Sequence, residues 1–213
     1  MLDDAARDLC AKGAALAVQG LARAGSGNIS VRVEDGRILI SPTGEGLGTM
    51  HPDALSILAP DGRHIGGPAP SKEWPLHLGV YAMRPDAGAV VHLHSPYATA
   101  WSMVEGLDPA NCLPPLTPYS VMRLGCVALL PFAVPGDAVL GDWVCERAGD
   151  HSAFLLANHG PVVSARTLKD AVFAAEELEE TARLALLLAA VPHRTLSDAD
   201  ITAINARYGD IYR

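Results

Sequence analysis

The sequence predicts an α/β fold in which helices cover a mixed, largely antiparallel β-sheet. Helical and strand-like segments interleave along the chain, but without the steady strand–helix–strand rhythm that a parallel sheet requires. An Asp35-Gly36 turn separates two β-branched runs, which is a strong signal for a hairpin. Hydrophobic residues make up 49% of the 213 residues and charged residues 19%, which excludes a disordered chain and provides for a sizeable core.

In the first half of the chain, turn residues separate the elements. Leucine and valine among alanines predict a first helix, which a Gly-Ser-Gly run ends. Ser71, with Glu73 in the first turn, is expected to cap a later helix that stops before Pro85. Glycines and prolines predict a loop between the strands and that helix. In order, we expect a helix at 5–22, strands at 29–33, 37–40 and 55–58, a loop at 61–70 and a helix at 71–83.

The second half continues the alternation and ends outside the compact pattern. Short apolar runs predict strands, and the longest helix has a Glu-rich and a Leu-rich face. Residues 192–213 are either a tail or contain a short helix at 198–207 that docks on a neighbour, and both alternatives stay open. In order, we expect a strand at 87–94, a helix at 96–104, a Pro-rich loop at 111–119, a strand at 126–130, a helix at 135–148, strands at 153–157 and 160–164, and a helix at 167–190.

Charge and hydrophobicity restrict the partners. A net charge of −8 argues against nucleic acid or an anionic membrane, but is compatible with a small phosphorylated substrate. The longest apolar run, residues 184–191, is far shorter than the roughly 20 residues of a membrane span, and the acidic N-terminus lacks a signal-peptide pattern. Four widely spaced cysteines are typical of free thiols in a reducing compartment. We expect a cytoplasmic protein with one domain over residues 1–213.

Three histidines indicate a metal site. His92 and His94 stand two residues apart in an apolar segment, so their side chains are expected on one face of a strand. Such a pair alone is more typical of ordinary polar residues at a strand end than of a metal site. His159, after another apolar run and before Gly160, favours a metal, because three imidazoles with an open position form a catalytic zinc site.

Glu73 and three loops extend this hypothesis. A carboxylate in the first turn of a helix has a structural role by default, through the helix dipole, and His77 on the same face is either a packed histidine or a partner of Glu73. The loops 25–28, 41–44 and 70–73 are rich in glycine and hydroxyl groups, and the last precedes a helix N-terminus, where anions bind readily. Each loop alone is a weak signal.

Taken together, these motifs resemble the class II aldolase/adducin family, in the right order over about residues 5–190. The resemblance implies a three-layer αβα fold and a homotetramer with active sites at subunit contacts. Further motifs resemble the 3-oxo-tetronate 4-phosphate decarboxylase branch, which forms dihydroxyacetone phosphate and CO2 through a metal-stabilised enediolate. The motifs quoted for the family are Gly27-Asn28-Ile29-Ser30, Ser41-Pro42-Thr43-Gly44, Pro70-Ser71-Lys72-Glu73, His92-Leu93-His94 and Asn158-His159-Gly160.

The resemblance also implies roles for single residues. Zn²⁺, or Mn²⁺ or Co²⁺ on the same nitrogens, would be held by His92, His94, His159 and Glu73, and Glu73 would also be the catalytic acid/base. Tyr119 would be a proton donor contributed by a neighbouring subunit. The substrate phosphate would be bound by Gly27, Asn28, Thr43, Gly44, Ser71 and Lys72.

The sequence departs from the pattern of one branch of the family at Lys72, and three other functions are alternatives to the decarboxylase. Lys72 stands where the fuculose-phosphate aldolase branch usually has serine, which weakens an aldolase assignment without excluding it. Within enzymes, the alternatives are a class II sugar-phosphate aldolase and a ribulose-phosphate 4-epimerase. A non-enzymatic, adducin-like binding module is disfavoured, because the four expected metal ligands are all present.

Overall fold

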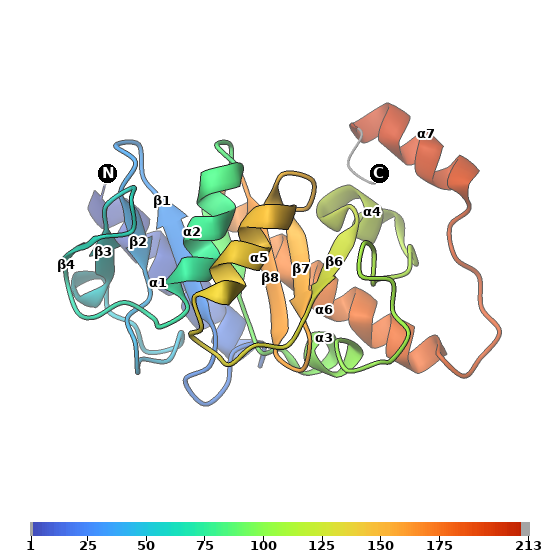
Figure 1. The fold of residues 1–213 in the computed structure, drawn as a ribbon, viewed down its shortest axis with the longest axis horizontal. Helices are drawn as coiled ribbons and strands as arrows, with labels where there is room; N and C mark the ends of the chain where they lie inside the picture. The colour runs from blue at the N-terminus through green and yellow to red at the C-terminus, as the bar shows by residue number, and fades with distance from the viewer. Residues whose placement is uncertain (1, 210–213) are drawn as a thin grey trace.

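A computed structural model describes residues 2–209, whose helices and strands form three layers (Figure 1). The helices are α1 (Leu2–Val18), α2 (Trp74–Met83), α3 (Pro96–Trp101), α4 (Pro118–Leu124), α5 (Val139–Ala148), α6 (Leu168–Leu188) and α7 (Asp198–Tyr208), with a 3-10 turn at Pro52–Ala54. The strands are β1 (Asn28–Arg32), β2 (Ile38–Ile40), β3 (Ser56–Leu58), β4 (His64–Gly66), β5 (Ala89–His92), β6 (Val127–Leu130), β7 (Ala153–Leu156) and β8 (Gly160–Ala165).

All eight strands belong to one sheet, in the order β4-β3-β2-β1-β5-β8-β7-β6. Neighbouring strands are antiparallel except β6 and β7, which are parallel. The hairpin of β1 and β2 forms around the Asp35-Gly36 turn, as the sequence predicts. In the centre of the sheet, β1 and β5 are in a register that sets Asn28 opposite His92.

The sheet divides the apolar core into two parts, because successive side chains of a strand point to opposite faces. In β5, Val91 packs on the side of α1, α3, α4 and α6, whereas Val90 packs on the side of α2 and α5. Figure 1 shows α2 and α5 in front of the strands and α6 behind them. The predicted three-layer α/β fold with a mostly antiparallel sheet is therefore confirmed.

Several boundaries differ from the prediction. The first helix ends at Val18 rather than residue 22, because the chain turns at Gly20 with a φ of 76°. The predicted strand at 87–94 ends at His92, so His94 lies beyond it. Ser71 does not cap α2: the helix begins at Trp74, and Glu73 occupies the N-cap position rather than the first turn. Pro75 fits the first turn, where no backbone N–H is needed.

Two elements lie where the sequence predicts loops. The segment 61–70 contains the edge strand β4, which is short, exposed and joined to β3 through an irregular register, so its pattern is weak. The helix α4 begins inside the predicted loop 111–119. Its start has a readable signal, a capping box of Thr117 and Ser120 with Pro118 in the first turn.

The C-terminal segment contains a helix, which is one of the two alternatives for residues 192–213. Ser197 and Asp200 form a capping box at the start of α7. The preceding chain is tied to the α4 region by a hydrogen bond from Leu196 N to Pro115 O of 2.9 Å. The remainder of that segment, 210–213, lies outside the described residues. Across residues 2–209, no helix combines the length and apolar character that crossing a bilayer demands.

Candidate metal centre and adjoining pocket

The three predicted histidines converge from two segments that lie side by side. His92 ends β5 and His94 follows it, while His159 lies in the turn between β7 and β8. Leu93 N donates to Pro161 O over 3.1 Å, which ties the two segments together. Gly160 allows their close approach: it has a φ of 156°, and a Cβ there would lie 2.1 Å from Leu93 O.

The ring nitrogens of the three histidines and one carboxylate converge on a common point. His94 Nε2 lies 3.2 Å from His92 Nε2 and 3.0 Å from His159 Nε2. Glu73 completes the group from the start of α2: its Oε2 lies 3.3 Å from His92 Nε2, and its Oε1 lies 3.2 Å from His159 Nε2. All four donor atoms lie within 4.8 Å of one another. The predicted set of metal-facing residues is thus brought together.

The tautomer of His92 suits a metal ligand. Its Nδ1 lies 2.9 Å from the carbonyl oxygen of Pro161, which can only accept a hydrogen bond, so Nδ1 carries the proton. This leaves Nε2 as the ring nitrogen that faces His94 and Glu73 and that is available to a metal. A backbone carbonyl in this position orients the ring of many metal-binding histidines.

The spacing of the donors fits a small divalent cation. Two nitrogens at 2.0–2.1 Å from a tetrahedral zinc ion lie about 3.3–3.4 Å apart. The contacts between neighbouring donor atoms here span 3.0–3.3 Å. Three imidazoles and a carboxylate match the ligand chemistry of zinc and of other late divalent ions. The residues therefore fit a bound divalent metal.

The protonation states also favour cation binding. Burial opposes ionisation of Glu73, but the close approach of His159 and His92 outweighs it and holds the pKa of this carboxyl well below its usual range. Burial lowers the pKa of His94 to about 4, assisted by its histidine neighbours, so its ring is neutral at pH 7. A carboxylate and a neutral imidazole are the forms in which Glu73 and His94 would bind metal.

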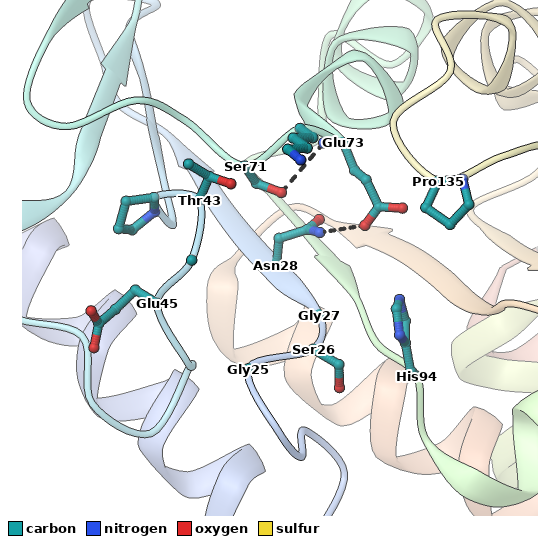
Figure 2. Close-up of a pocket in the computed structure, with 13 residues that line it drawn as sticks. Gly25, Ser26, Gly27, Asn28, Thr43, Glu45, Ser71, Glu73, His94 and Pro135 are labelled. Carbon is teal, nitrogen blue, oxygen red and sulfur yellow. Dashed lines mark hydrogen bonds between the residues drawn. The ribbon is translucent and has the colours of Figure 1, made fainter.

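A pocket of about 230 Å³ opens beside this cluster (Figure 2). Figure 2 shows Glu73 and His94 at one end of the pocket and Thr43 and Glu45 at the other. The six residues predicted to bind phosphate all line it: Gly27, Asn28, Thr43, Gly44, Ser71 and Lys72. Within this wall, Ser71 Oγ accepts a hydrogen bond of 3.3 Å from Glu73 N. The loops that were weak signals one by one thus form one cavity.

Tyr119 is not brought to this site within the chain. It lies in the first turn of α4, is exposed, and lines a separate groove together with Arg123 and Phe173. Its predicted role therefore concerns a second subunit and stays a prediction. The isolated histidines His51, His64 and His193 lie in exposed positions and take no part in the cluster.

Sequence reasoning missed Glu179, a buried carboxylate of α6 that supports the site from behind. Its two oxygens accept hydrogen bonds from Tyr97 N over 2.9 Å and Ala98 N over 2.8 Å, at the start of α3. That start follows His94 by two residues. A signal was available: Ala175 and Ala182, four residues before and three after Glu179, set it on the apolar face of the helix.

The chain is similar to several known proteins over most of its length. The protein named 3-oxo-tetronate 4-phosphate decarboxylase from Escherichia coli (strain K12) is 45% identical over 188 residues, covering 88% of this chain and 89% of its own. The crystal structure of YgbL from Escherichia coli superposes with a TM-score of 0.93 at 41% identity, over 95% of this chain and 98% of that one. The L-fuculose phosphate aldolase of Escherichia coli (strain K12) is 33% identical, over 89% of this chain and 86% of its own.

The family assignment follows from the extent of the match. The sequence profile described as Class II Aldolase and Adducin N-terminal domain matches residues 7–186, which include every strand and all of the metal-facing residues. The chain therefore belongs to the class II aldolase and adducin family.

Proposed function

We propose that this chain is a metal-dependent decarboxylase that converts 3-oxo-tetronate 4-phosphate into dihydroxyacetone phosphate and CO2. The observation that carries the proposal is the convergence of Glu73 and three histidines beside a pocket lined with hydroxyl, glycine and lysine residues. The choice of substrate is supported by the 45% identical relative that bears this activity in its name.

The proposed metal is Zn²⁺, held by His92, His94, His159 and Glu73, with Mn²⁺ or Co²⁺ as alternatives on the same ligands. When bound, such an ion supplies a Lewis acid for the carbonyl oxygen and the adjacent hydroxyl of the substrate. The donor spacing and the ionised Glu73 support this assignment.

In the proposed reaction, the bond between the carboxylate carbon and C2 breaks, and CO2 leaves. The electron pair stays with C2 and spreads to the oxygen of the neighbouring carbonyl, which gives an enediolate. C2 then receives a proton to form dihydroxyacetone phosphate. Glu73 is proposed as the group that moves this proton, because its buried carboxylate faces both the histidines and the pocket.

The phosphate is proposed to lie at the end of the pocket away from the histidines. Thr43 and Ser71 offer hydroxyl groups there, and Lys72 offers a positive charge. Gly44 leaves its backbone open to close approach, since no atom lies within 4 Å of the place of a Cβ, and Gly27 lines the same wall. Asn28 shares this wall. Binding energy from the phosphate can position the reacting bond, which lies several atoms away.

A homotetramer in the cytoplasm, with Tyr119 as a proton donor from a neighbouring subunit, completes the proposal. Tyr119 is exposed and outside the pocket of its own chain, so it would have to reach the site of another copy. Light scattering tests the assembly, and mixing Tyr119→Phe subunits with His94→Ala subunits tests the sharing. Activity restored in the mixture would support shared sites, whereas the absence of restoration would contradict them.

A direct assay tests the reaction. Purified protein loaded with Zn²⁺ is given 3-oxo-tetronate 4-phosphate, and both dihydroxyacetone phosphate and CO2 are measured against a sample without enzyme. The control without enzyme is essential, because a 3-oxo acid also decarboxylates spontaneously. Equal amounts of the two products above this background are expected. Failure of the metal-loaded protein to accelerate the reaction would overturn the decarboxylase assignment.

Glu73→Gln tests the acid/base role. With excess Zn²⁺ supplied to offset the weaker binding, we expect the variant to hold the ion through its three histidines and to lose about 10²–10⁴-fold in kcat, the usual contribution of a positioned acid or base. Metal content is measured by elemental analysis alongside turnover. An unchanged kcat would remove Glu73 from the proposed mechanism.

The second candidate is a class II sugar-phosphate aldolase, favoured by the 33% identical relative named L-fuculose phosphate aldolase. The same ligand set suits both reactions, because each leaves an electron pair next to a carbonyl. The products distinguish them: an aldolase releases an aldehyde, whereas the proposed decarboxylase releases CO2.

A further inference from the structure

A line of buried polar side chains leads from the candidate metal centre into the space between α2 and β1. Glu73, His77 and Tyr81 are spaced four residues apart and share one face of α2 and its N-cap. Asn28 and Ser30 are two apart and share one face of β1. All five are less than a tenth exposed, and side chains from the helix and the strand alternate along the line.

Four hydrogen bonds join these side chains in sequence. Asn28 Nδ2 lies 2.8 Å from Glu73 Oε2, and His77 Nε2 lies 2.6 Å from Asn28 Oδ1. Ser30 Oγ lies 2.7 Å from His77 Nδ1 and 2.8 Å from the hydroxyl of Tyr81. The line therefore runs without a break from Tyr81 to Glu73.

The donor of each bond can be deduced from the end at Glu73. Asn28 Nδ2 donates to the carboxylate of Glu73, so the carbonyl oxygen of this amide faces His77. His77 Nε2 must then carry a proton. Burial lowers the pKa of His77 to about 3, so the ring is neutral and its Nδ1 accepts from Ser30. Ser30 in turn accepts from Tyr81.

We propose that His77 is a positioning residue for Glu73: through its Nε2–H it holds the Asn28 amide in the one orientation that donates to the carboxylate. Ser30 and Tyr81 contribute by fixing the tautomer of His77. The consequence is that Glu73 is held by Asn28 and faces the three histidines before any metal binds. Residues that orient metal-facing groups in this way typically affect metal affinity by about 10–100-fold.

These hydrogen bonds also give Asn28 a role different from the phosphate binding that the resemblance implies. Both ends of its amide are engaged by Glu73 and His77, and the residue is only 3% exposed. Its side chain therefore acts on the carboxylate, and the phosphate is left to the other residues of the pocket wall. This role rests on the proposed function only in so far as Glu73 is a metal ligand.

Two substitutions of His77 separate the proposed role from simple packing. In His77→Gln, an amide NH2 can replace the Nε2–H and still donate to Asn28. In His77→Asn, the shorter side chain falls short of Asn28. We expect Zn²⁺ affinity, measured by competition with a chromophoric chelator, to fall about 10–100-fold in His77→Asn and by less than threefold in His77→Gln. Equal affinities of the two variants would overturn the proposal.

Two further variants serve as controls. Val80→Ala shortens another fully buried side chain of α2, an apolar one that takes part in none of these four hydrogen bonds, so it should lower Tm and leave Zn²⁺ affinity within threefold of wild type. In an Asn28→Ala background, His77→Asn should cause no further loss, because the link to Glu73 is already absent. A loss of equal size in that background would show that His77 acts independently of Asn28.

The tautomer of His77 can be measured in the wild-type protein without metal or substrate. Nitrogen-15 NMR of the histidine rings should find Nε2 protonated and Nδ1 unprotonated at pH 7. A proton on Nδ1 would overturn the inference even if every variant failed to fold. The result is independent of the decarboxylase assay, so failure of the proposed reaction and failure of this inference are distinguishable.

Discussion

The buried carboxylate of Glu179 provides the sharpest test of how the site is supported. Glu179→Gln keeps the shape of the side chain but replaces one acceptor oxygen by an NH2 group. That group would face the backbone N–H of Tyr97 or Ala98, which is also a donor and would then have no acceptor. A buried N–H left in this way costs about 1–3 kcal/mol, and the second bond loses its charge assistance, which adds about 1 kcal/mol.

The expected cost is therefore about 2–4 kcal/mol of unfolding free energy. For a chain of this size each kcal/mol shifts Tm by about 2–4 °C, so Tm should fall by roughly 5–15 °C. Urea titrations of the metal-free protein measure the free energy directly. All variants are compared at one protein concentration, because the unfolding of an oligomer depends on concentration.

Glu180→Gln is the matched control, since it makes the same chemical change at the next position of α6. Glu180 is exposed and pairs with Arg183 three residues on, an arrangement worth at most about 0.5 kcal/mol. Indistinguishable stabilities of the Glu179 and Glu180 variants would refute the reasoning. We also expect Glu179→Gln to weaken Zn²⁺ binding, because α3 begins two residues after His94 and its Thr99 hydroxyl bonds the carbonyl of His159 over 3.2 Å.

Three more predictions concern the metal centre. His94→Ala should lose bound Zn²⁺ and activity together, because His94 contacts both other histidines. Elemental analysis measures the metal content and an assay measures turnover. Full turnover without metal would contradict this prediction. Gly160→Ala should lower the free energy of unfolding by about 1–3 kcal/mol, because the new Cβ would collide with Leu93 O. Gly149→Ala is the control, since a Cβ there meets nothing within 4 Å. Equal Tm values of the two variants would contradict the prediction. The last prediction concerns the pH dependence of stability in metal-free protein. The pKa of His77 is about 3 in the folded protein, against 6.5 for an ordinary histidine, so between these two pH values the unfolded chain binds more protons than the folded one. His77 should therefore contribute a fall in stability of about 1.4 kcal/mol per pH unit as the pH drops below 6.5, to which the depressed pKa of His94 adds. Urea titrations of His77→Gln should show a shallower slope than wild type.

Local patterns predicted the parts of the fold that are locally determined. The hairpin at Asp35-Gly36 and the long amphipathic helix α6 follow from turn chemistry and periodicity, and both are present. The strand β4 could not be predicted in the same way. It exists because the edge of β3 offers hydrogen bonds to a three-residue segment that has little strand character of its own.

The candidate site shows the same division. His92 and His94 are close in sequence, so their meeting could be inferred from spacing, although His94 lies beyond the strand. The partners that hold the site lie far apart in the chain: Asn28 is 45 residues from Glu73. Contacts of this kind depend on the register of β1 against α2, which no local pattern encodes. They could be found only once the layers were in place.

The metal-facing groups are anchored separately, and this separation bears on how the site tolerates change. His92 is oriented by a backbone carbonyl, Glu73 by the amide of Asn28, and the segment after His94 by Glu179. These anchors come from different elements, so each can be disturbed by its own substitution. The groups that they hold are in contact, however: Glu73 Oε2 lies 3.3 Å from His92 Nε2, so we expect the effects of combined substitutions on metal affinity to be coupled rather than additive. Because the same ligand set suits more than one reaction, the shape and charge of the pocket wall set which substrate is cleaved.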